Sequence, residues 1–132
     1  GVHPQAILKV YTAAIRSVLE YACEVWHTHL TVEQSNNIEY VQKRALKILS
    51  PDTSYRDALV LYKLETLHSR RNNICKKFFM QMLNDNHKLN YLLPPKRNID
   101  RQLRAMNCYP LPKVRTNRCK NTIINYGLFN YQ

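Results

Sequence analysis

The acidic residues of this chain are too scattered to form a catalytic metal centre. The chain has 9 Asp and Glu residues, and no two of them are adjacent in the sequence. Metal-assisted phosphoryl transfer needs carboxylates that converge on one or two cations. Asp52 and Asp57 suit a turn and a helix start instead, where acidic side chains are favoured. We therefore predict no catalytic residue, and no enzyme activity for the chain on its own.

The cysteines and histidines also lack the spacing of a reactive or metal-binding site. Cys23 and His27 share a helix face, but a structural zinc site needs four ligands, commonly in two close pairs, and no second pair exists. Cys75 lies beside Lys76 and Lys77, which favour a thiolate, yet its apolar neighbours favour packing in the core. We expect no metal ion or other cofactor in this chain and no disulfide framework.

The basic residues carry the strongest functional signal. The net charge is +11, and residues 51–132 hold fifteen of the 20 Lys and Arg residues against five acids. Such a surplus suits a polyanion, because neutralised phosphates release condensed counterions. The candidate nucleic-acid-binding residues form three clusters, which are Lys43, Arg44 and Lys47; Arg70, Arg71, Lys76 and Lys77; and Lys96, Arg97, Arg101, Arg104, Lys113, Arg115, Arg118 and Lys120.

Aromatic residues accompany the last of these clusters. From Arg101 onward the chain has six bases and no acid, interleaved with Tyr109, Tyr126, Phe129 and Tyr131. Aromatic rings beside cations can stack unpaired bases. A basic surface that only keeps the chain soluble, or one that meets an acidic protein, is the alternative.

The elements that would position these residues begin with one long amphipathic helix. Apolar residues recur every three to four positions from Pro4 to Trp26, and a proline suits the first turn of a helix. Tyr21, Trp26 and Tyr40 stand at helical spacing among aliphatic residues, which favours core packing over base stacking. We expect all three rings to be buried.

Three further helices are predicted from their capping residues. Thr31 and Gln34 have the spacing of a capping box, and the helix that they start ends near residue 50. The short connection before it favours an antiparallel hairpin with the first helix. Ser54 and Thr66 are the expected N-caps of a third and a fourth helix. Glu39 is assigned to an outer face of the second helix. The core-facing residues of that helix are predicted to be Ile38, Val41, Ala45, Ile48 and Leu49.

Prolines interrupt the last third of the chain. Pro94, Pro95, Pro110 and Pro112 forbid regular helix around them, so short helical or extended pieces are expected there. We predict a mainly α fold, in which an antiparallel helical hairpin and further helices form a small bundle before a basic irregular C-terminal tail. The predicted domains are a helical domain over residues 1–93 and the Pro-interrupted tail over 94–132. No run approaches the roughly 20 apolar residues that span a bilayer, so we expect no membrane partner.

Two blocks of sequence resemble a known family. Residues 16–26 (RSVLEYACEVW) and 38–48 (IEYVQKRALKI) are similar to the thumb region after the palm in reverse transcriptases of non-LTR (LINE-type, jockey/CR1-like) retrotransposons. Shorter matches follow at residues 70–71 and 116–122. Glu24 stands where that family often has a proline, and its helix should therefore run unbroken through Trp26.

The resemblance implies a function for the chain. It would be the non-catalytic C-terminal part of an RNA-directed DNA polymerase of a transposable element, where it grips template and primer through their phosphates. Its partners would be the RNA template, the DNA primer or target DNA, and an upstream palm domain that holds magnesium. The first residues run straight into a helical pattern, so we expect a cut from a longer polypeptide, found in the nucleus and cytoplasm of a eukaryotic cell. A helical protein-interaction module and a decayed relic without activity are the alternatives.

Overall fold

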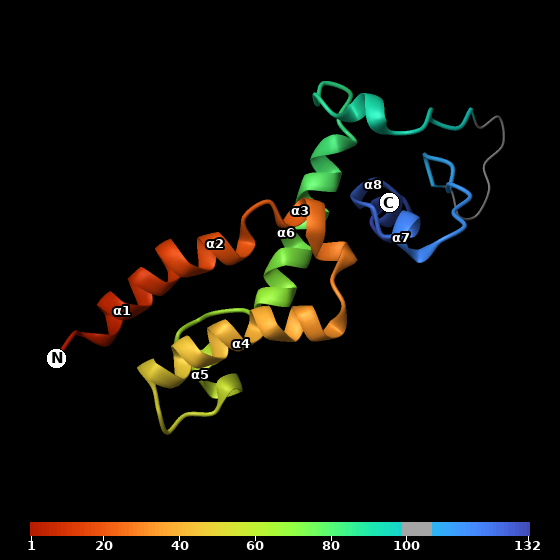
Figure 1. The fold of residues 1–132 in the computed structure, drawn as a ribbon. Helices are drawn as coiled ribbons and strands as arrows, with labels where there is room; N and C mark the ends of the chain where they lie inside the picture. Colours follow the sequence, from red (N-terminus) through yellow and green to blue (C-terminus); the bar gives the residue numbers. More distant parts are fainter. Residues whose placement is uncertain (99–106) are drawn as a thin grey trace. The chain divides into compact units, whose positions relative to one another are not determined.

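The structure is a computed structural model that describes residues 1–98 and 107–132. The regular structure of these residues is helical, without strands (Figure 1), which confirms the predicted mainly α fold. The chain divides into two compact units. The first unit contains Gly1–Cys23 and Leu30–Asn72, and the second contains Glu24–His29 and Asn73–Gln132.

The first unit is built on an antiparallel helical hairpin. Its helices are α1 (Pro4–Val10), the π-helical turn η1 (Tyr11–Ile15), α2 (Arg16–Glu20), α4 (Val32–Leu49), α5 (Tyr55–Leu61) and the first part of α6 (Leu67–Met82). Figure 1 shows α1 and α2 beside α4 and running in the opposite direction. The predicted hairpin is therefore confirmed.

The first arm of the hairpin ends earlier than predicted. α2 stops before Tyr21, and Ala22 has a φ of 49°, a left-handed conformation that residues with a Cβ rarely adopt. A new helix, α3 (Cys23–Trp26), follows and leads into the 3-10 helix η2 (His27–His29). The prediction of an unbroken helix through Trp26 is wrong. The break falls where the chain passes from the first unit to the second, so tertiary packing overrides local helix propensity here.

The predicted capping residues are confirmed. The Thr31 hydroxyl accepts a hydrogen bond from the Gln34 backbone N–H at 3.2 Å, and Gln34 Oε1 accepts from the Thr31 N–H at 3.0 Å, which completes the capping box of α4. Ser54 accepts from the backbone N–H three residues on at 3.3 Å at the start of α5. Thr66 does the same at 3.2 Å at the start of α6.

The core of the first unit differs from the prediction in its aromatic residues. Tyr21 is 79% exposed and Tyr40 is 61% exposed, while Trp26, which belongs to the second unit, is half-buried. The expectation that all three rings are buried is therefore wrong for both tyrosines. The buried apolar side chains of this unit include Tyr11, Cys23, Leu46, Ala58 and Leu67.

The second unit has its own apolar core. It contains the rest of α6, the 3-10 helix η3 (Asn90–Leu92), α7 (Asn117–Lys120) and α8 (Ile123–Asn130). Phe79 on α6, Leu128 on α8 and Tyr109, which precedes α7, are buried against one another. Gly127 permits this approach, because a Cβ at that position would lie 2.1 Å from Phe79 Cδ2. The tail therefore supplies part of a core, and its short helices match the short pieces expected after the prolines. Whether residues 1–93 and 94–132 are separate domains stays a prediction.

Candidate nucleic-acid interface

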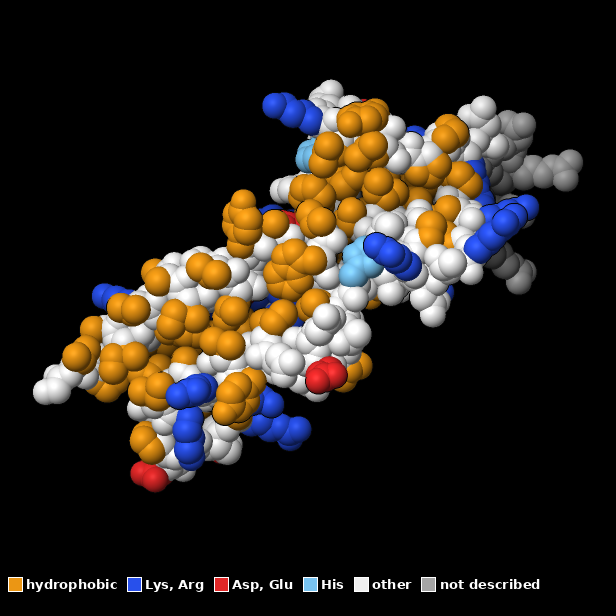
Figure 2. Space-filling model, in the orientation of Figure 1, with side chains coloured by type: hydrophobic (Ala, Val, Ile, Leu, Met, Phe, Trp, Pro, Cys, Tyr) orange, Lys and Arg blue, Asp and Glu red, His pale blue; other side chains and the backbone are white. Residues whose placement is uncertain are grey.

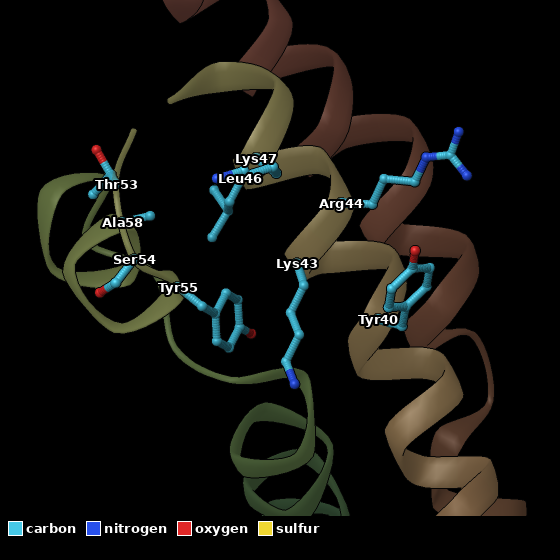
Figure 3. Close-up of a pocket in the computed structure, with 9 residues that line it drawn as sticks. All are labelled: Tyr40, Lys43, Arg44, Leu46, Lys47, Thr53, Ser54, Tyr55 and Ala58. Atoms are coloured by element: carbon cyan, nitrogen blue, oxygen red, sulfur yellow. The ribbon is translucent and has the colours of Figure 1, made fainter. Parts of the chain in front are cut away.

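Three exposed cations lie together on α4. Lys43, Arg44 and Lys47 fall on one broad side of the helix, because neighbours three and four positions apart share a face. Figure 2 shows Lys and Arg side chains over the α4 and α5 region of the first unit. The three cations line a pocket of about 380 Å³ between α4 and α5 (Figure 3). The other lining residues, none of them acidic, are Tyr40, Leu46, Thr53, Ser54, Tyr55 and Ala58.

The pocket combines an apolar floor with a charged rim. Leu46 and Ala58 are each 1% exposed and provide buried apolar surface. Lys43 Nζ lies 5.4 Å from the centroid of the Tyr55 ring, a distance at which a cation is attracted to the ring face. Figure 3 shows Lys43 and Tyr55 approaching each other, while the Arg44 guanidinium points away from α5. Lys47 Nζ donates to the backbone carbonyl of Pro51.

A buried glutamine fixes the helices around this pocket. Gln42 is fully buried on α4, and its Oε1 accepts from the Tyr11 hydroxyl at 2.7 Å. Its Nε2 donates to the Tyr55 hydroxyl at 3.0 Å and to the Glu65 carbonyl at 2.9 Å. A buried amide is stable only when its donors and acceptors are satisfied, and here they join residues from three separate parts of the first unit.

Glu39 completes the same network and corrects a prediction. It was assigned to an outer face of the second helix, but it is only 9% exposed. Its carboxylate accepts from the Tyr55 hydroxyl and from the backbone N–H groups of Leu67 at 3.1 Å and His68 at 3.2 Å. It therefore stabilises the positive end of α6. Burial, followed by the bond to Glu39, raises the pKa of Tyr55 above its ordinary value, so the hydroxyl stays protonated.

The buried face of α4 is consequently rotated from the predicted one. Glu39, Gln42 and Leu46 point inward, whereas Val41 is 37% exposed and Ile48 is 65% exposed. The polar side chains can be buried because partners distant in the sequence satisfy them.

Arg70 and Arg71 occupy structural positions instead of a free surface. Arg70 Nε lies 2.5 Å from Glu20 Oε1, and its Nη2 donates to Glu20 Oε2 at 3.1 Å. The hydrogen bond to Glu20 raises the pKa of Arg70. Arg71 is fully buried, and its Nη2 donates to Ser35 Oγ at 3.2 Å. Both were predicted to bind phosphates, but their surroundings commit them to the fold.

The remaining candidate cations lie in the second unit. Lys96 forms an exposed ion pair with Asp85 at 2.9 Å, and Lys120 Nζ lies 5.1 Å from the centroid of the Phe129 ring. Arg101 and Arg104 lie outside the described residues. The other candidates are exposed, and these are Lys76, Lys77, Arg97, Lys113, Arg115 and Arg118.

The tail aromatics are engaged within the second unit. Tyr109 is 4% exposed. The centroid of the Tyr131 ring lies 5.5 Å from the centroid of the Tyr126 ring and 6.0 Å from that of the Phe79 ring. Burial raises the pKa of Tyr131 to about 12. Their availability for stacking on unpaired bases is reduced accordingly, because rings packed in a core present little free face.

Two of the four cysteines are packed in the core. Cys23 and Cys75 are fully buried, which confirms core packing for Cys75. Within residues 1–98 and 107–132, no group of three or more His, Cys, Asp or Glu side chains could hold a metal ion. In the same ranges we find no helix with the length and hydrophobicity of a membrane span.

None of the protein-family models, curated proteins or solved structures with which we compared the chain matches it. The site must therefore be interpreted from its own geometry. Sequence reasoning found the cations of the pocket but missed Tyr40 and Tyr55 as its aromatic lining. Tyr40 stands three positions before Lys43, a spacing that signals a shared helix face. Tyr55 has no comparable signal, since its contacts come from distant residues.

Proposed function

We propose that the chain is a non-catalytic, nucleic-acid-binding C-terminal segment of a retrotransposon RNA-directed DNA polymerase. It grips the template and primer through their phosphate backbones. The observation that carries this proposal is the cluster of Lys43, Arg44 and Lys47 around a pocket without acidic lining. Phosphate contacts need positive charge and reach but no base identity.

The resemblance of residues 16–26 and 38–48 to the thumb region of non-LTR reverse transcriptases supports the same function. The second block contributes two kinds of residue. Glu39 and Gln42 are buried and join helices, while Lys43, Arg44 and Lys47 are exposed. A short block that both stabilises a fold and presents cations is what a backbone-gripping element requires. Catalytic carboxylates and magnesium would belong to the upstream palm.

A salt series tests the proposal. Fluorescence anisotropy with an RNA–DNA hybrid would compare the native chain with a triple Lys43→Gln, Arg44→Gln, Lys47→Gln variant. Each phosphate contact contributes about −0.9 to the log–log slope on B-form DNA, so loss of three contacts in the triple variant should flatten the slope by up to about 2.7 units.

The matched control removes the same charge elsewhere. Lys9, Lys63 and Lys88 are exposed and are not candidate ligands, so their triple replacement by Gln should change the slope much less. An equal effect of the two triple variants would mean that overall charge, and not the α4 cluster, carries the binding. Binding that is independent of salt would refute a phosphate grip.

The second candidate function is a protein-interaction module. It is favoured by apolar side chains on the surface of the first unit, where Val10 is 61%, Val18 is 74% and Val60 is 79% exposed. Figure 2 shows hydrophobic side chains gathered over the α1 and α2 region, and contiguous exposed apolar surface is typical of contact with another protein. Under this alternative, the native chain would not bind nucleic acid in the salt series. Val18→Ser would abolish binding to the protein partner.

A further inference from the structure

We infer that the pocket between α4 and α5 holds one unpaired nucleotide, with its base against the tyrosine-lined wall and its phosphate at the lysines of α4. This inference rests on the proposed function and names the part of the nucleic acid that the site selects. A base that is paired and stacked in a duplex cannot enter a pocket, whereas an unpaired base can be splayed out from its strand.

The dimensions and lining of the pocket fit such a ligand. A volume of about 380 Å³ lies within the range of small-molecule pockets. Leu46 and Ala58 form an apolar floor, and the rings of Tyr55 and Tyr40 line the pocket on opposite sides of Lys43 (Figure 3). Aromatic rings stack on any base, because every base has a π face.

The Tyr55 ring is held in place before a ligand arrives. The Tyr55 hydroxyl donates to Glu39 and accepts from Gln42 Nε2 at 3.0 Å, and both partners are buried on α4. The ring therefore has little freedom to move. A fixed ring loses little conformational entropy on binding, which favours affinity.

The combination of a cation, an aromatic ring and an apolar floor in the pocket favours a nucleotide over an acidic peptide as its ligand. Lys43 Nζ lies over the Tyr55 ring, so one cation and one aromatic surface are available at the same place. A peptide carboxylate would satisfy the lysine but would leave the apolar floor and rings unfilled. A nucleotide offers a flat ring system and an anionic phosphate within one residue, and fills both parts.

Abasic substitution provides the test. Fluorescence anisotropy would compare a short oligothymidylate with the same strand carrying abasic positions, at one salt concentration, for the native chain and variants. The charges of the two strands are equal, so any difference reports on the bases. Stacking contributes enough per base that the abasic strand should bind about fivefold or more weakly.

Two variants and two controls connect this difference to the pocket. Tyr40→Leu removes an exposed ring and should lower the difference between the strands to less than about twofold. Lys43→Gln should weaken binding of both strands. Lys9→Gln matches the charge change, and Tyr91→Leu removes a ring that is 77% exposed in the second unit; both controls should leave the strand difference intact.

The outcomes separate this inference from the proposed function. Salt-dependent binding with no difference between normal and abasic strands would overturn the nucleotide pocket and leave the phosphate grip standing. A difference that survives Tyr40→Leu but disappears in Tyr91→Leu would overturn the placement in this pocket. Absence of binding to any strand would overturn both proposals.

Discussion

The first unit contains two basic pairs on helices, Lys43–Arg44 on α4 and Arg70–Arg71 on α6, and their surroundings are opposite. The α4 pair is exposed at a pocket without acidic lining. In the α6 pair, Arg70 is bound to Glu20 and Arg71 is fully buried. Adjacent cations therefore mark a candidate binding surface only where the fold leaves them without acidic neighbours. Charge density in the sequence does not make that distinction.

The largest expected effect concerns Arg71. Arg71→Ala should destabilise the chain by about 3–5 kcal/mol, because it empties a large, fully buried side-chain site and leaves Ser35 Oγ without its donor. Urea denaturation would measure the free energy of unfolding, with Arg44→Ala as the exposed control from the other pair. Equal losses for the two variants would erase the difference between the pairs.

The ion pair of Arg70 with Glu20 should have a smaller effect. The two side chains are 32% and 12% exposed, so the coupling between them is expected to be about 1 kcal/mol, between the values for surface pairs and buried charged hydrogen bonds. A double-mutant cycle with Glu20→Gln and Arg70→Gln measures this coupling. A coupling near zero would show that Arg70 is not committed to the fold and could still bind phosphate.

The hydrogen-bond network of Tyr11, Gln42 and Tyr55 should make the stability of the fold fall at alkaline pH. Burial raises the pKa of Tyr11 from 10.0 to about 12, so the folded chain keeps this proton where the unfolded chain loses it. The corresponding stabilisation is complete below pH 10 and is lost as the pH rises through about 12. Chemical denaturation across this interval should show the decline, and Tyr11→Phe should reduce its steepness. A decline of the same steepness in Tyr11→Phe would assign it to other groups.

The smallest effect on stability is expected for the α4 pair itself. Lys43→Gln with Arg44→Gln should change the free energy of unfolding by less than about 0.5 kcal/mol, since exposed substitutions rarely do more. The same variant should flatten the salt dependence of nucleic-acid binding. Thermal melts and anisotropy on one preparation would check both parts. A clear loss of stability would make Lys43 or Arg44 structural, like the α6 pair.

Local signals in the sequence predicted part of this fold. Thr31, Ser54 and Thr66 were identified as capping residues because a cap depends only on residues within one helical turn. The inward face of α4 was not predicted, since Glu39 and Gln42 are buried by partners far along the chain. Periodicity assigns polar side chains to the surface unless a distant partner is known.

The candidate site was likewise predicted where it depends on local signals and missed where it depends on distant contacts. Its cations were predicted from composition, and their grouping on α4 followed from helical spacing. The separation of Lys43 and Arg44 from Arg70 and Arg71 could not be predicted, because it depends on where Glu20 meets α6. The pocket wall at Tyr55 depends likewise on the packing of α5 against α4.

Gly127 determines how closely α8 can approach α6 in the second unit. The bare backbone at this position faces the Phe79 ring, and even a methyl group there would overlap that ring. The absence of a side chain at this position therefore permits the close approach of α8 to α6, and Gly127→Ala would displace either the Phe79 ring or the last helix.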